Sequence, residues 1–216
     1  MSARRRTERD RPRRSHGQNF LADPAVVRKV LRAVEVADGD LVVDVGAGGG
    51  ALTVPLALAG AHVLAVEVDA TWVERLRDRV RQAGVGDRVR VVQADLRRVP
   101  WPREPFRVVA NPPFNLTTAL LHRLLDDPAA GPTRADLIVQ AAVARKRAQQ
   151  PPTTLLSAAW APWWDCSSGL RIDRHAFRPL PRVDAALLTI RRRDPPILPP
   201  HLARTFATLL RPAWDR

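Results

Sequence analysis

The sequence predicts an α/β fold with a mostly parallel sheet and helices on both of its faces. Continuous apolar runs of strand length alternate with segments whose apolar residues recur at helical spacing. A glycine-rich segment, "DVGAGGG" (44–50), joins the first long strand to the helix that follows it. Strands without a polar face are buried on both sides, which is typical of a parallel sheet covered by helices.

The predicted elements follow one another in a regular order. The first helix runs from Asp23 to Val36, with Asp23 as its N-cap and Pro24 at the first helical position. The predicted strands are residues 41–45, 62–68, 88–94, 106–110, 136–140 and 184–190. The further predicted helices are residues 51–60, a segment around 72–80, 116–125 and 201–210. We expect one sheet, followed after about residue 190 by a proline-rich linker.

Length and charge narrow the class of protein. A chain of 216 residues with 45% hydrophobic content can form one domain with a substantial core. The net charge is +13, and 33 of the 35 basic residues are arginine, which suits phosphate oxygens. Residues 1–14 hold seven arginines against Glu8 and Asp10, which predicts a disordered basic arm. These features favour a polyanionic partner.

Other features exclude several classes of site. No run of about 18 apolar residues occurs, so we expect a soluble, cytoplasmic protein. Cys166 is the single cysteine, which excludes a disulfide framework or a cysteine-rich zinc site. The five histidines lack metal-ligand spacing, so no metal is expected. Trp160, Trp163 and Trp164 are expected to pack in the core rather than to form a base-stacking platform.

The glycine-rich segment predicts a nucleotide-like cofactor and leaves its identity open. Glycines between a strand and a helix let the backbone turn sharply and present N–H groups to a ligand. Gly46, Gly48 and Ala51 fit the dinucleotide fingerprint G-x-G-x-x-G/A, and Glu67 lies 21 residues after Gly46, where a ribose-binding acid is expected. On these residues, an NAD-dependent oxidoreductase remains an alternative.

Two acidic residues favour S-adenosylmethionine over NAD. Asp44, at the end of the first long strand, can face an ammonium group, which S-adenosylmethionine carries and NAD lacks. Asp95 ends the third strand, where it can accept a hydrogen bond from the exocyclic amine of adenine while Leu96 packs on the ring. With Glu67, these residues form a row of acceptors along the carboxyl edge of the sheet, where open α/β folds bind ligands.

The segment "NPPF" (111–114) predicts the acceptor of the methyl group. The N6 amine of adenine is a poor nucleophile because its lone pair is delocalised into the ring. If the Asn111 side-chain oxygen and the Pro112 carbonyl each accept one N–H, the lone pair is directed at the methyl group. Phe114 offers a face for the target base, which must be flipped out or single-stranded. We therefore expect Asn111, Pro112 and Phe114 to be the catalytic residues.

Taken together, these motifs resemble those of the rRNA adenine N6-dimethyltransferases. The similarity runs from about Ser15 to Arg193 through "GQNFL", "DVGAGGG", "VEVD", "NPPF" and "AFRPLPRVDAALL", five motifs in order. The resemblance implies a class I S-adenosylmethionine-dependent methyltransferase, Rossmann-like, with a catalytic domain over 15–193. It places cofactor contacts on Gln18, Asn19, Leu21, Gly46, Glu67, Asp95 and Asn111, in addition to Asp44, Gly48 and Leu96.

The branch of this family is left open between two ribosomal substrates. "NPPFN" is closer to the kasugamycin-sensitivity enzymes, which act on 16S rRNA. The arginine-rich arm and "AFRPLPRVDAALLTIRRR" are more similar to erythromycin-resistance methylases of actinobacteria, which act on 23S rRNA, and we favour these. The resemblance then implies macrolide-lincosamide-streptogramin B resistance and a monomer that modifies rRNA before ribosome assembly is complete.

The RNA-binding surface is assigned from clusters of arginine. We expect phosphate contacts from the arm, from "RKR" (145–147) and from the triple arginine that ends the last strand. The residues are Arg4, Arg5, Arg6, Arg13, Arg14, Arg145, Arg147, Arg191, Arg192 and Arg193. The family normally continues into a helical RNA-binding domain, so we interpret residues 194–216 as a linker and a remnant of that domain.

Overall fold

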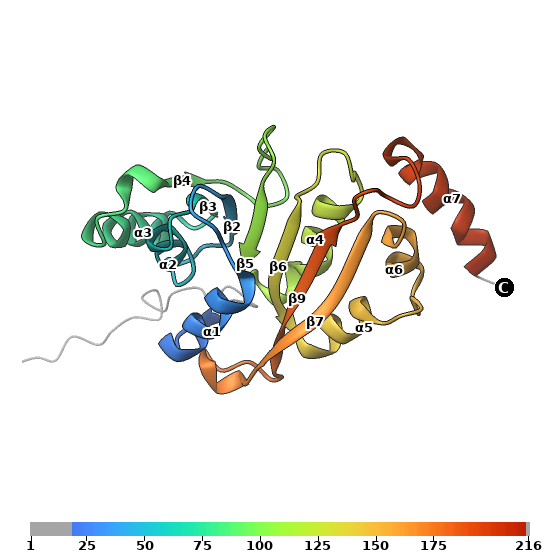
Figure 1. The fold of residues 1–216 in the computed structure, drawn as a ribbon. Coiled ribbons are helices and arrows are strands. Elements are labelled where there is room, and N and C mark those ends of the chain that lie inside the picture. Colours follow the sequence, from blue (N-terminus) through green and yellow to red (C-terminus); the bar gives the residue numbers. More distant parts are fainter. Residues whose placement is uncertain (1–18, 215–216) are drawn as a thin grey trace, which may run out of the picture.

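A seven-stranded sheet forms the centre of the molecule (Figure 1), for which a computed structural model describes residues 19–214. Its strands are β2 (Leu41–Val45), β3 (His62–Glu67), β4 (Val89–Gln93), β5 (Arg107–Ala110), β6 (Arg134–Gln140), β7 (Trp164–Ile172) and β9 (Ala185–Arg192). They lie in the order β4-β3-β2-β5-β6-β9-β7. The first five are parallel, whereas β9 is antiparallel to both β6 and β7. The predicted mostly parallel sheet is confirmed.

Helices cover both faces of this sheet. Successive strand residues point to opposite faces, so Val42 and Val43 belong to different cores, as do Leu187 and Leu188. One core receives side chains from α1 (Pro24–Val34), α2 (Thr53–Leu58) and α3 (Ala70–Gln82). The other receives them from α4 (Thr117–Leu125), α5 (Ala141–Ala148) and α6 (Leu155–Trp160). Burial on both faces explains why the strands are continuously apolar.

A buried charge cluster holds α1 against the sheet at the edge where β5 and β6 begin. Arg107 donates to the main-chain oxygen of Glu35 at 3.1 Å, just past the end of α1, and to Asp40 at 2.7 Å. Asp136 is fully buried and pairs with Arg134, with 2.7 Å between its Oδ2 and the Arg134 Nε. Carbonyl groups at a helix end lack partners within the helix, so these arginines satisfy them and fix α1 in place.

A small second sheet joins the beginning of the described chain to its last third. It pairs β1 (Phe20–Leu21) with β8 (Phe177–Arg178) in antiparallel orientation, with Phe20 opposite Arg178 and Leu21 opposite Phe177. Neither strand was predicted, because two residues carry no periodicity. The pairing places the segment before α1 at the carboxyl edge of the central sheet.

The region from residue 141 to 172 contains more secondary structure than its sequence predicted. It contains α5, α6 and β7, none of which was predicted, and the edge strand β7 is irregular between Ser168 and Arg171. Trp160, Trp163 and Trp164 are buried, which confirms their expected place in the core.

The last described helix, α7 (Ala203–Trp214), packs beside this core. The ring of Phe206 meets that of Trp163 edge-on, with 5.8 Å between the ring centroids. Within residues 19–214, no helix is long and apolar enough to cross a membrane.

Candidate active site

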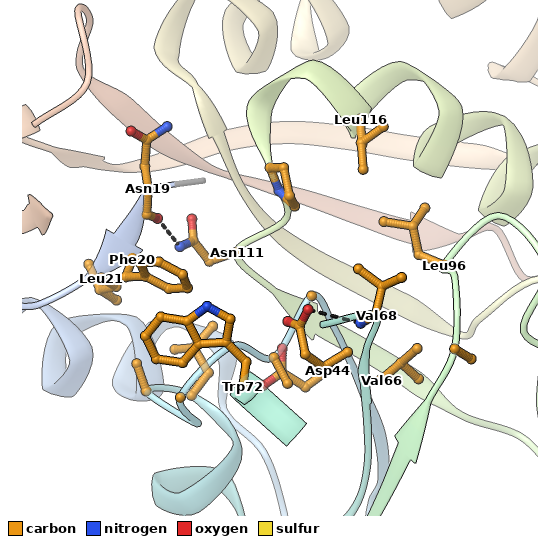
Figure 2. A pocket seen from close by; sticks show the side chains of 18 of the residues that line it. Asn19, Phe20, Leu21, Asp44, Val66, Val68, Trp72, Leu96, Asn111 and Leu116 are labelled. Carbon is orange, nitrogen blue, oxygen red and sulfur yellow. Dashed lines mark hydrogen bonds between the residues drawn. The ribbon is translucent and has the colours of Figure 1, made fainter. Parts of the chain in front are cut away.

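A cavity of about 440 Å³ opens at the carboxyl ends of four neighbouring parallel strands. The ends of β2, β3, β4 and β5 carry Asp44, Glu67, Asp95 and Asn111, all of which line it. The volume falls within the range of roughly 300 to 1,000 Å³ that small-molecule sites occupy. The structure thus brings together the four polar residues that the sequence placed at separate strand ends. Figure 2 labels two of them, Asp44 and Asn111.

The glycine-rich loop after β2 forms one wall of the cavity. Its Gly46 has a φ of 75° and donates its N–H to the main-chain oxygen of Val66 at 2.8 Å. Gly48 has a φ of 51°, and a Cβ built there would lie 2.8 Å from the ring of Phe20. Positive φ and close approach are both conditions that glycine alone meets without strain. The loop is therefore shaped to present backbone to a ligand.

Asp44 lies deep in the cavity and is 1% exposed. Its Oδ2 accepts a hydrogen bond of 2.6 Å from the Thr53 hydroxyl. Burial raises the pKa of Asp44 to about 7; the charge of Glu67 also raises it, while the hydrogen bonds from Thr53 act in the opposite direction. A buried carboxyl group with this pKa is prepared to ionise when a cationic group arrives beside it.

Glu67 is also buried, and backbone N–H groups hold it in place. Its Oε2 accepts from Gly48 at 2.8 Å, and its Oε1 accepts from Val68 and Asp69 at 2.9 and 3.0 Å. Each carboxylate oxygen has more than one lone pair, so Oε2 keeps capacity for a further donor. Glu67 therefore ties the glycine-rich loop to the end of β3 and can still accept a ribose hydroxyl.

Asp95 differs from the expectation because its carboxylate is already engaged. The Arg97 side chain donates through Nε to both oxygens at 3.0 Å and through Nη2 to Oδ2 at 2.5 Å. The hydrogen bonds from the Arg97 side chain, together with one from its main-chain N–H, lower the pKa of Asp95 to about 2. Arg97 and Leu96 both line the cavity. An adenine amine at this position would share Asp95 with a guanidinium group.

Asn111 follows β5 and points into the cavity. Its Nδ2 donates to the main-chain oxygen of Asn19 at 2.8 Å, as the dashed line in Figure 2 shows. A carbonyl oxygen can only accept, so this contact turns the Nδ2 toward Asn19 and leaves the Oδ1 on the other side. Among the described residues, that buried Oδ1 finds no donor. Such an orphaned acceptor is costly unless a ligand satisfies it.

The prolines and the aromatic ring after Asn111 lie beside the cavity. Pro113 lines it, and the Pro113 Cδ lies 3.3 Å from the position of a Cβ built on Gly46, so the two motifs are packed together. Phe114 begins a 3-10 turn, and its partly buried ring meets the edge of Phe177 with 6.2 Å between the centroids. The Phe114 ring thus follows a residue of the cavity wall and packs on the core beside it.

Sequence reasoning missed two aromatic residues of this site. Phe20 and Trp72 line the cavity with their ring centroids 4.4 Å apart, and they cover Gly48 and Gly49. Trp72 was predicted as part of the apolar face of a helix. Its position three residues after Asp69, which caps α3, was the signal that could have placed it at the carboxyl edge of the sheet.

Several residues predicted to bind RNA are engaged within the protein. Arg147 donates to the hydroxyls of Thr154 and Ser157 at 2.9 and 3.0 Å. Arg193 donates to the main-chain oxygen of Ala161 at 2.9 Å, and Arg192 is partly buried, with its Nη1 3.4 Å from the carbonyl oxygens of Pro128 and Gly131.

Two of the arginines predicted to bind RNA, Arg145 and Arg191, are exposed. Gln18, Arg4, Arg5, Arg6, Arg13 and Arg14 lie outside the described residues.

Comparison with known proteins identifies the family of this chain. The model of the ribosomal RNA adenine dimethylase family matches residues 9–214. The chain belongs to that family. It is 37% identical over 198 residues to the mycinamicin-resistance protein MyrB of Micromonospora griseorubida, which covers 92% of this chain and 61% of MyrB. It is 38% identical over 195 residues to ribosomal RNA small subunit methyltransferase A of Thermobifida fusca, covering 86% of this chain and 67% of the relative.

A solved structure is similar over most of the chain. The 23S rRNA methyltransferase ErmE superimposes with a TM-score of 0.78 at 27% sequence identity, covering 89% of this chain and 78% of ErmE. Family membership makes the protein an rRNA (adenine-N6)-methyltransferase that uses S-adenosylmethionine. The NAD-dependent alternative that the glycine-rich segment left open is thereby excluded.

Proposed function

We propose that this cavity holds S-adenosylmethionine and that the enzyme methylates N6 of a specific adenosine in 23S rRNA. The observation that carries the proposal is the buried Oδ1 of Asn111, a residue of the cavity wall; this oxygen lacks a donor among the described residues. The N6 amine has the N–H groups that this acceptor lacks. The bound cofactor supplies an electrophilic methyl group, and the chain supplies the positions of both reactants.

The cavity residues fit the cofactor by their chemistry. Asp44 is buried and suited to an ammonium group, while Glu67 has an oxygen with spare capacity for a ribose hydroxyl. Asp95, with Leu96 beside it, is suited to an adenine amine and ring. Asn19, Leu21 and Gly46 line the same cavity, and we assign them to the wall around the methionine part. We add Gly48 and Gln18 to that wall from their motifs.

Activation of the amine rests on Asn111 and Pro112. When the Asn111 Oδ1 and the Pro112 carbonyl each accept one N–H, the nitrogen becomes tetrahedral and its lone pair leaves the ring system. The Asn19 carbonyl keeps the Asn111 side chain in the orientation that this requires. Preorganised dipoles of this kind avoid the cost of reorientation during the reaction. The residues themselves stay neutral throughout.

Phe114 is suited to hold the flipped base. Its ring follows Pro113, which lines the cavity, and it is braced by the buried ring of Phe177. Stacking on an aromatic side chain contributes about 1 to 3 kcal/mol per base and tolerates any sequence. The base would then lie with its N6 toward Asn111 and its sugar toward solvent.

The choice of 23S rRNA and of drug resistance rests on the relatives. ErmE acts on 23S rRNA and MyrB is a resistance protein, so we assign 23S rRNA methylation and macrolide-lincosamide-streptogramin B resistance to this chain. Similarity to a small-subunit methyltransferase at 38% identity keeps a 16S rRNA substrate as the alternative.

One experiment separates the two substrates. The enzyme is incubated with radiolabelled S-adenosylmethionine and either protein-free 23S or 16S rRNA, and primer extension maps the modified nucleotide. We expect a single adenosine in 23S rRNA, and a macrolide-sensitive host that expresses the protein should become resistant. Labelling of 16S rRNA alone would establish the alternative, and no labelling of either RNA would overturn the proposal.

The organisation around the catalytic domain is part of the same proposal. We assign catalysis to residues 15–193, a basic RNA-binding arm to residues 1–14, and a linker with a helix of the RNA-binding domain to residues 194–216. The arm carries a net charge of +5, from seven arginines and two acids, which favours phosphate contacts without sequence readout. The enzyme would act as a cytoplasmic monomer on rRNA that assembling ribosomes still expose. Sedimentation velocity with and without RNA tests whether the enzyme is a monomer.

A further inference from the structure

Arg178 lies at the mouth of the cavity, and neither cofactor binding nor activation of the amine uses it. It is on β8 directly opposite Phe20, and residues opposite each other in an antiparallel pair share one face of the sheet. Arg178 therefore lies on the side of β8 that faces the cavity, which it lines together with Asn19 and Asn111. The preceding residue, Phe177, points the other way into the core and supports Phe114.

No carboxylate among the described residues neutralises the charge of Arg178. Its Nη1 donates to the main-chain oxygens of His175 and Phe177 at 2.9 and 2.8 Å. None of the ion pairs formed within residues 19–214 includes Arg178, whereas Arg97 on the adenine side of the cavity is paired with Asp95. The Arg178 side chain is exposed. Two carbonyl groups thus hold the guanidinium group in place, while its Nε and Nη2 have no acceptor within residues 19–214.

A held guanidinium group at the cavity that Asn111 also lines suits one kind of ligand. A nucleotide inserted toward Asn111 keeps its sugar and phosphates at the mouth, where Arg178 lies. Guanidinium groups bind phosphate oxygens through two parallel N–H donors, and preorganisation by the carbonyls makes binding less costly in entropy. We propose that Arg178 binds a backbone phosphate of the rRNA at or next to the target adenosine and so positions the flipped base toward Asn111. This inference rests on the proposed function.

The test compares two variants, each of which replaces one arginine by glutamine and so loses one positive charge. Arg178→Gln should raise KM for an RNA hairpin substrate about tenfold, since it removes a charge-assisted hydrogen bond. It should also reduce the log–log salt slope of RNA binding by about 1. S-adenosylmethionine affinity, measured by titration calorimetry, should stay within twofold. The matched control is Arg77→Gln, an exposed arginine of α3 away from the cavity lining, which should leave KM unchanged.

A chemical substitution in the RNA locates the contact. Replacing the phosphates around the target adenosine one at a time by methylphosphonate removes single negative charges. In the wild-type enzyme one such replacement should raise KM about as much as Arg178→Gln does, and in Arg178→Gln the same replacement should have no further effect. Arg178→Lys should recover part of the affinity, because it restores the charge without the paired donors.

The possible failures are distinguishable. If the wild-type enzyme methylates no rRNA, the proposed function fails whatever Arg178 does. If the wild-type enzyme is active and Arg178→Gln keeps its KM and salt slope, the phosphate contact is overturned and the proposed function stands. A decrease in cofactor affinity equal to the decrease in RNA affinity would place Arg178 in the cofactor wall and would also overturn the inference.

Discussion

The Asn111 side chain donates through its Nδ2 to the main-chain oxygen of Asn19 at 2.8 Å, across 92 positions of sequence. This contact decides the orientation of the carboxamide, because the Asn19 carbonyl can only accept and therefore faces the Nδ2. The segment before α1 thus sets the orientation of a residue at the end of β5.

Replacing Asn111 by alanine should reduce methyl transfer at least about 100-fold, the effect typical of removing one preorganised hydrogen-bonding group from an active site. S-adenosylmethionine affinity should change only a few-fold, because the main role of Asn111 is to orient the amine. Single-turnover transfer of radiolabelled methyl groups measures the first quantity, and titration calorimetry measures the second. Wild-type turnover in Asn111→Ala would show that N6 is activated by other groups.

The ring of Phe114 can be tested by two substitutions. Phe114→Ala should lower kcat/KM for an RNA hairpin about 5- to 150-fold, which corresponds to the removal of about 1 to 3 kcal/mol of base stacking. Phe114→Tyr keeps an aromatic face and should be nearly neutral. If alanine and tyrosine gave the same rate, the ring would have no role in stacking on the target base.

Gly48 and Gly84 form a matched pair for testing the glycine-rich loop. Both have positive φ, 51° and 68°, so alanine strains the backbone at either position. A Cβ at Gly48 would lie 2.8 Å from the Phe20 ring, whereas one at Gly84 meets nothing within 4 Å. Gly48→Ala should therefore reduce the affinity for the cofactor strongly. Gly84→Ala should lower the free energy of unfolding by about 1 kcal/mol and leave the affinity for the cofactor unchanged. Equal cofactor affinities in the two variants would contradict this steric argument.

The pKa of Asp44 predicts a pH dependence of cofactor binding. Its value of about 7 means that the carboxyl group is largely protonated in the free enzyme at pH 6. An ammonium group beside it favours the ionised form, so binding releases a proton below pH 7. Affinity for S-adenosylmethionine should rise with pH up to about 7 and then level off. Calorimetry in buffers of different ionisation enthalpy detects the proton that is released when the cofactor binds.

The matched variant for this measurement is Asp44→Asn, which keeps the shape of the side chain and cannot ionise. It should bind the cofactor weakly, with an affinity that no longer changes between pH 5.5 and 8. A pH dependence that persists in Asp44→Asn would assign the titrating group elsewhere.

The basic arm should act on RNA and not on the cofactor. Deleting residues 1–14 removes seven arginines, and the log–log salt slope of RNA binding should fall by about 1 for each phosphate that the arm neutralises. We expect a slope several units flatter and an unchanged affinity for S-adenosylmethionine. An unchanged salt slope would show that the RNA is bound elsewhere, for example by the exposed Arg145 and Arg191.

Sequence patterns predicted the elements that are buried on both faces. Val42 and Val43 lie in different cores, so their strand is continuously apolar and easily recognised. The pattern was less informative in α5, where the last turn is "RKR" and only Ala144 is fully buried. It failed for β7, an edge strand whose middle is exposed and polar. A periodic pattern of apolar residues appears only where one side of an element is buried. Because α5 and β7 bury a small part of their surface, their sequences carry little of this pattern.

The polar residues of the site were predictable because each one ends a parallel strand. Their neighbours were harder to foresee, since contacts between distant segments decide them. The engagement of Asp95 by Arg97 depends on the turn between them, and Trp72 reaches the cavity through its contact with Phe20. The arginines at 147, 192 and 193 look equivalent to exposed ones in sequence, yet their donors are directed at oxygens of this chain.

The pairing of β1 with β8 has a consequence for the smallest piece of this chain that could work as an enzyme. The strands that carry Asp44, Glu67, Asp95 and Asn111 are complete by residue 111. The segment that orients Asn111 is nevertheless held against Phe177 and Arg178, far along the chain. A fragment that ended before β8 would keep the row of acceptors without the brace on Phe114 and the anchor of Asn19. Catalysis therefore belongs to the whole domain rather than to its nucleotide-binding half, and dissecting the two should give a binder of cofactor without turnover.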